Sequence, residues 1–99
     1  MKLEKTINNN ELTIAVSGRL DTMTAPELDN EIRLSSDSIT SLVLDFANLE
    51  YVSSAGLRVV LSAQKAMNQQ GGKMKVTNVN EIVKEVFDIT GFADILNIE

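Results

Sequence analysis

A strand, a short loop and an amphipathic helix follow one another in residues 41–61, which read SLVLDFANLEYVSSAGLRVVL. The apolar run at 41–46 is rich in strand formers and predicts a buried central strand. Apolar residues then recur at helical spacing, which predicts a helix over about 54–70. Two adjacent hydroxyls, Ser53 and Ser54, therefore lie where this helix begins. Serine is a preferred N-cap, and the same position suits a phosphate because free N–H groups and the positive dipole end meet there.

Two strands and a helix are expected before this segment. Alternating apolar residues predict a hairpin of strands at 2–7 and 11–17, with a polar asparagine turn between them and Gly18 ending the second strand. Thr24 opens a capping-box pattern, with glutamate three residues later and proline in the first turn. This pattern predicts a helix at about 24–35.

Three further elements are expected after the segment. Gly71-Gly72 ends the long helix, one of the two taking the left-handed position, and a strand follows at 73–78. Asn80 caps a helix that Gly91 ends, and residues 92–98 fit a helical turn or a final strand. The order ββαβαβα predicts an α/β fold with a mixed sheet of four to five strands, covered by about three to four helices.

The composition narrows the class of protein. The 99 residues fit one domain, spanning 1–99. Aromatic residues make up 4% and tryptophan is absent, so an aliphatic core is expected. A formal charge of −5 argues against nucleic-acid binding, which needs a basic surface. The chain has neither a signal-peptide pattern nor an apolar run near the roughly 20 residues of a membrane helix, so we expect a cytoplasmic protein without membrane insertion.

Catalytic motifs fail in this sequence. Histidine and cysteine are both absent, which excludes a Ser-His-Asp triad, histidine metal sites and thiolate chemistry. Val52 stands where the nucleophile-elbow pattern around Ser54 requires glycine. Ser62 and Lys65 match S-x-x-K, but they lie in mid-helix without the companion motifs. We therefore expect no enzyme, and no catalytic, cofactor-binding or metal-binding residues.

Local sequence alone favours a plain capping role for Ser53 or Ser54. Arg58 fits this interpretation poorly, because a cation in the first turn opposes the helix dipole by about 0.3–1 kcal/mol. A nearby carboxylate such as Asp21 or Asp45 would compensate for it, and a role in binding is the alternative.

Two stretches together resemble a known family. Leu44-Asp45-Phe46, Leu49 and Val52–Leu57 are similar to the signature of the STAS domain in its stand-alone form, the anti-anti-sigma factor, and Ser17–Asp21 resembles the family's G-x-L-D stretch. The resemblance covers essentially the whole chain. It implies an anti-sigma factor antagonist: a STAS-fold protein that binds an anti-sigma factor with serine kinase activity when unphosphorylated. Phosphorylation ends that binding and so regulates transcription, and a metal-dependent serine phosphatase resets the switch.

The resemblance also implies where the switch lies. Aligning Gly56-Leu57 with the family pattern places the phosphoacceptor at Ser54, and Ser53, where the family often has aspartate, is the alternative acceptor. The implied partner-binding surface comprises Asp21, Thr22, Ser53, Ser54, Ala55, Gly56, Leu57 and Arg58. Three alternatives stay open: a non-phosphorylated STAS scaffold, a small cytoplasmic STAS subunit of a lipid-transport complex, and a nucleotide or small-ligand binder.

Overall fold

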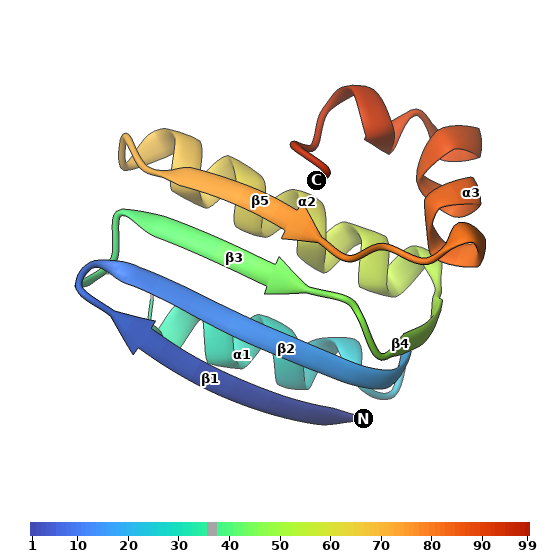
Figure 1. Ribbon diagram of the computed structural model, residues 1–99, viewed down its shortest axis with the longest axis horizontal. Helices are drawn as coiled ribbons and strands as arrows, with labels where there is room; N and C mark the ends of the chain where they lie inside the picture. Colours follow the sequence, from blue (N-terminus) through green and yellow to red (C-terminus); the bar gives the residue numbers. More distant parts are fainter. Residues whose placement is uncertain (36–37) are drawn as a thin grey trace.

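A five-stranded mixed sheet forms the centre of the computed structural model, which describes residues 1–35 and 38–99 (Figure 1). The strands are β1 (Lys2–Asn8), β2 (Glu11–Leu20), β3 (Ser41–Asp45), β4 (Leu49–Val52) and β5 (Lys73–Thr77). Four of them lie in the order β1-β2-β3-β5, and β4 pairs with the last residues of β2. β1 runs antiparallel to β2, whereas β2 pairs in parallel with β3 and β4, and β3 with β5.

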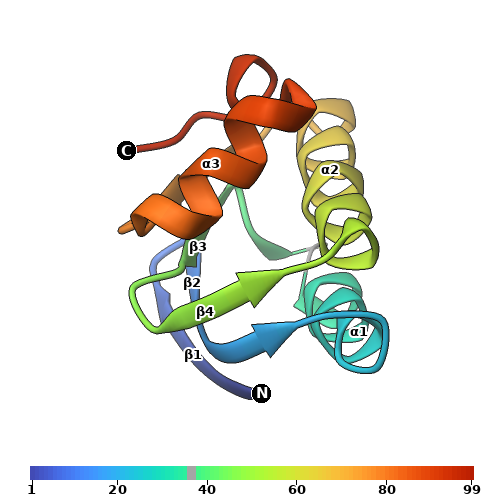
Figure 2. The ribbon, with the colours of Figure 1, turned by 90° about the vertical axis from the view of Figure 1, so that its right-hand side faces the viewer.

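The helices cover one face and one end of this sheet. They are α1 (Ala25–Ser35), α2 (Ser54–Gln69), α3 (Glu81–Thr90) and the short 3-10 helix η2 (Phe92–Asp94). α1 and α2 pack side by side on the same face, and α3 packs against β4 at the end of the sheet (Figure 2). The expected α/β fold with a mixed sheet is confirmed, and none of the described helices is long and apolar enough to span a membrane.

β2 does not end at Gly18, so that expectation is wrong. Gly18 adopts a left-handed φ of 90°, a conformation that glycine reaches without steric cost, and the strand continues to Leu20. The pairing with β4 shifts register between Gly18 and Arg19, as at a β-bulge. β2 therefore has two parallel partners in succession besides the antiparallel β1: residues 11–15 pair with β3, and residues 18–20 pair with β4.

β4 is an element that sequence patterns did not predict. Leu49 and Val52 are buried, while Glu50 and Tyr51 between them are exposed, so the four residues show no simple alternation. The strand is held in place by its parallel pairing with β2. β4 lies between β3 and α2 in the sequence, and α2 begins directly after it.

The core is largely aliphatic, but its two bulkiest members are aromatic. Phe46 and Phe87 are fully buried, and their rings stack with centroids 6.5 Å apart and an interplanar angle of 25°. The expected aliphatic core is confirmed, and this aromatic pair is an addition to it. Because Phe46 follows β3 and Phe87 belongs to α3, the contact fixes α3 against the sheet.

The remaining helix boundaries agree with the sequence. The Asn80 side chain accepts a hydrogen bond from the Val83 N–H at 2.8 Å, which caps α3 as predicted. Gly71 and Gly91 take the left-handed conformation just after α2 and α3, with φ of 76° and 80°. Beyond Gly91 the chain forms both η2 and a single parallel bridge from Ile98 to β5, so each suggestion for residues 92–98 holds in part.

Candidate functional site

The carboxyl ends of β2 and β4 lie side by side, and each strand leads through a loop into a helix (Figure 2). Leu20 pairs with Val52, and the Ser53 N–H donates to the Leu20 carbonyl at 2.9 Å. β2 leads into α1 and β4 leads into α2, so the starts of the two helices meet at one edge of the sheet. Ligand and partner sites commonly form at such an edge in α/β proteins. The fold thus brings together Asp21 and Ser53, which are far apart in the sequence.

Ser53 is the N-cap of α2. Its backbone is extended, with φ of −96° and ψ of 177°, and its hydroxyl accepts a hydrogen bond from the Gly56 N–H at 3.4 Å. The Ser53 carbonyl also accepts from the Leu57 N–H at 2.9 Å, which closes the first helical turn. The side chain is half-buried, so Ser53 is committed to the fold.

Ser54 is the first residue of α2 and is exposed. Its hydroxyl makes no hydrogen bond to any residue that the structure describes. Ala55 behind it is half-buried, whereas Gly56 and Leu57 are buried beneath the surface. Local sequence left either serine as the cap, and the family resemblance placed the phosphoacceptor at Ser54 with Ser53 as the alternative. Among the described residues, the Ser53 hydroxyl is hydrogen-bonded and the Ser54 hydroxyl is not.

Gly56 permits the close approach of α2 to β2. A Cβ atom at this position would lie 2.7 Å from Leu20 Cγ, 2.9 Å from the Leu20 carbonyl oxygen and 2.9 Å from Val52 Cγ2. These separations are too short for any side chain. Gly56 and Leu57 therefore lie beneath the expected binding surface. Their packing against the sheet fixes the position of Ser53 and Ser54.

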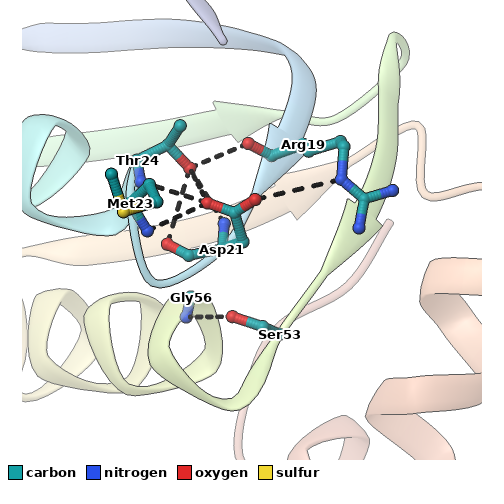
Figure 3. Close-up of polar contacts among 6 residues, drawn as sticks. All are labelled: Arg19, Asp21, Met23, Thr24, Ser53 and Gly56. Carbon is teal, nitrogen blue, oxygen red and sulfur yellow. Dashed lines mark hydrogen bonds and ion pairs between the residues drawn. The ribbon is translucent and has the colours of Figure 1, made fainter.

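Asp21 organises the loop that faces Ser53 (Figure 3). Its Oδ1 accepts hydrogen bonds from the N–H groups of Met23 at 3.0 Å and Thr24 at 3.2 Å. The Thr24 hydroxyl donates to the Arg19 carbonyl at 2.8 Å and accepts from the Asp21 N–H at 2.9 Å. The capping-box expectation for Thr24 is therefore replaced by a turn that the Asp21 carboxylate holds.

The same contacts keep Asp21 ionised. Partial burial acts to raise the pKa of its carboxyl, but hydrogen bonds from the Thr24 and Met23 N–H groups and the Thr24 hydroxyl outweigh it, with help from the Arg19 charge. The net effect lowers the pKa of Asp21 below its ordinary value. A fixed negative charge thus lies beside the start of α2.

The carboxylates that were expected to balance Arg58 are engaged elsewhere. Asp21 Oδ2 lies 3.9 Å from Arg19 Nε, and Asp45 accepts from the Asn78 side chain at 3.0 Å. Arg58 is exposed and forms no ion pair with any residue among those described, so of the two alternatives given for it, compensation by Asp21 or Asp45 is not found. Thr22, the remaining predicted contact residue, is also exposed.

Three further side chains at this edge were missed by the sequence argument. The Arg19 guanidinium carbon lies 4.3 Å from the centre of the Tyr51 ring, a cation–π contact across the β2–β4 pair. Met23 is 87% exposed, which is unusual for a large apolar side chain. The Arg19–Tyr51 contact depends on the register of β4, so only recognition of that strand would have revealed it.

The arrangement has the chemistry of a modifiable binding surface. Among the described residues, it offers a hydroxyl without a hydrogen-bond partner at a helix start, a fixed carboxylate on the neighbouring loop, and an arginine without an ion-pair partner four residues into the helix. In the described part of the chain, no three carboxylate side chains gather closely enough to hold a metal ion.

Comparison with known proteins identifies the family and the fold. The STAS domain family matches residues 2–99. The anti-sigma-B factor antagonist of Bacillus subtilis (strain 168) is 31% identical over 91 residues, which cover 92% of this chain and 84% of that protein. The anti-sigma factor antagonist SpoIIAA in its unphosphorylated form aligns with a TM-score of 0.86 at 18% identity, covering 99% of this chain and 88% of that one. The phosphorylated form of SpoIIAA from Bacillus aligns with a TM-score of 0.79 at 17% identity, covering 99% and 91%. The structural similarities establish the shared fold.

Proposed function

The chain belongs to the STAS domain family, and we propose on that premise that it is an anti-sigma factor antagonist switched by phosphorylation of Ser54. In its unphosphorylated form it binds an anti-sigma factor that is also its serine kinase. Phosphorylation of Ser54 ends the binding, and a metal-dependent serine phosphatase restores it. The protein acts in the cytoplasm as a binding module and as a substrate, not as an enzyme.

The division of roles between Ser53 and Ser54 is the observation that carries this proposal. A kinase must reach a hydroxyl that is free and exposed, and Ser54 has both properties. Ser53 holds the Gly56 N–H, so its phosphorylation would remove a cap from α2. The relative from Bacillus subtilis is named for antagonism of an anti-sigma factor, which supports the same function here.

Electrostatics explains how a phosphate would act without refolding the protein. Phosphorylation adds about −1.5 to −2 charges, which a helix N-terminus tolerates. The new charge would join the Asp21 carboxylate on the same surface, so a partner that packs there would meet repulsion and a desolvation cost. A loss of about 3 kcal/mol of binding free energy corresponds to roughly a hundredfold weaker affinity, which is enough to exchange partners.

A phosphorylation assay tests the acceptor directly. The protein is incubated with the anti-sigma kinase of its own genome and ATP, and the modified residue is located by mass spectrometry. We expect phosphate on Ser54, none in Ser54→Ala, and continued phosphorylation of Ser53→Ala. Phosphate on Ser53 alone, or on neither serine, would refute the proposal.

A binding assay tests the consequence. Ser54→Asp places a permanent charge at the acceptor, and we expect tenfold or greater weakening of anti-sigma factor binding in calorimetry, with a thermal midpoint close to that of the unmodified protein. Glu50, exposed on β4, provides a control position: Glu50→Gln changes the charge at this end of the molecule away from the acceptor. Capture of a membrane ATPase complex in place of an anti-sigma factor would assign the chain to a lipid-transport machine.

A further inference from the structure

We propose that Arg58 receives the phosphate on Ser54, so that an ion pair within one turn of α2 stabilises the phosphorylated state. This inference rests on the proposed function only in placing the phosphate on Ser54. It concerns how this chain holds the modification, whichever partner the modification excludes.

The helical spacing brings the two side chains together. Ser54 and Arg58 are at positions i and i+4 of α2, and both are exposed on its surface. Residues at this spacing have Cβ atoms about 5–6 Å apart. Side chains of an α-helix lean toward its N-terminus, so the arginine extends toward the serine. A phosphate on the shorter side chain therefore lies within reach of the guanidinium group on the longer one.

Arg58 has no competing partner among the described residues. Another cation at this edge, Arg19, is already placed against the Asp21 carboxylate and the Tyr51 ring. Neither Asp21 nor Glu50 forms an ion pair with Arg58. The guanidinium is thus available, and its fork of N–H donors matches phosphate oxygens in two-point contacts.

Phosphorylation would reverse the effect of Arg58 on stability. In the unmodified protein the arginine is the fifth residue of α2, next to the first turn, where the positive end of the helix dipole disfavours its charge. With a dianion at Ser54, the same side chain gains a charge-assisted hydrogen-bonded partner. Arg58 therefore destabilises the unphosphorylated state and stabilises the phosphorylated one, which biases the protein toward retaining its phosphate.

The test uses protein with phosphoserine incorporated at position 54 during translation, so that neither kinase nor partner is needed. The phosphate is titrated by phosphorus NMR in the parent, in Arg58→Gln, in Arg58→Lys and in Lys65→Gln. Lys65 is exposed on the same helix but about three turns from Ser54, roughly 16 Å along the axis and beyond the screening length at physiological salt. Because an ion pair favours the dianion, Arg58→Gln should raise the second pKa of the phosphate by about 0.2–0.7 unit. Arg58→Lys should raise it less, and Lys65→Gln should leave it unchanged.

Thermal unfolding supplies a second readout. Arg58→Gln should raise the midpoint of the unmodified protein and lower that of the phosphoserine protein, a reversal that a purely structural arginine would not produce. An unchanged phosphate pKa in Arg58→Gln, or an equal shift in Lys65→Gln, would overturn the inference. A kinase that modifies another residue would refute the proposed function and leave this result intact, because no kinase takes part in the measurement.

Discussion

Replacing the two serines one at a time separates the cap from the acceptor. Ser53→Ala removes the hydroxyl that accepts from the Gly56 N–H, and loss of a serine cap costs about 0.5–2 kcal/mol. The 3.4 Å distance is long for this kind of bond, whose usual value is about 2.9–3.0 Å, so we expect the lower half of that range, about 0.5–1 kcal/mol. For a domain of this size, this corresponds to a fall of roughly 2–8 °C in the thermal midpoint.

Ser54→Ala should behave differently. The Ser54 side chain is exposed and has no hydrogen-bond partner in the described structure, so its loss should change the free energy of unfolding by less than about 0.5 kcal/mol. Urea unfolding with a common m-value gives both free energies. Ser53→Asn, which restores a capping side chain, should recover the stability that Ser53→Ala loses. Equal losses at the two positions, or a larger loss at Ser54, would refute the assignment of Ser53 as the cap.

Two further predictions concern the residues that support the serines. Gly56→Ala places a Cβ within 2.7–2.9 Å of Leu20 and Val52, so overpacking by about 1–3 kcal/mol should outweigh the higher helix propensity of alanine, which is worth about 1 kcal/mol; equal stability in urea unfolding would contradict this. Asp21→Asn should abolish a pH-dependent part of the stability. Because the folded pKa of Asp21 is lowered, its carboxylate stabilises the protein above the unfolded pKa near 3.9, and this contribution is lost as the pH falls through the folded pKa. The stability gap between parent and Asp21→Asn should therefore narrow on acidification below about pH 4, and a gap that widens would contradict the assignment.

Local sequence patterns predicted most of the helices and strands, because the spacing of apolar residues matches the faces that are buried. The alternation of Leu12, Ile14 and Val16 marks the face of β2 that packs into the core, and the stripe of α2 places Leu57 and Val60 inside. Asn80 and Gly91 bound α3 for reasons that act within a few residues. In each of these cases the deciding interaction is short-range, so the sequence alone carries enough information.

The failures arise where a distant strand decides the structure. β4 has only four residues, two of them exposed, and its pairing with the end of β2 stabilises it across about thirty positions of the chain. The same pairing lets β2 continue beyond Gly18, where local sequence predicts that the strand ends. It also fixes which serine caps α2, because the Ser53 N–H is bound to the Leu20 carbonyl. The sequence named Ser53 and Ser54 as the two candidate caps, but the choice between them required the register of β2 and β4.

The bulge at Gly18 also makes the two halves of β2 independently variable. A one-residue slip in an ordinary strand moves every side chain to the opposite face. Here an insertion or deletion beside the bulge would alter the register against β4 alone, while Leu12 and Ile14 kept their places against β3. The edge that carries Asp21 and Ser54 can thus be shifted by mutation while the β2–β3 part of the core keeps its register, and the repacking is confined to the buried side chains of the β2–β4 pair, Leu20, Leu49 and Val52.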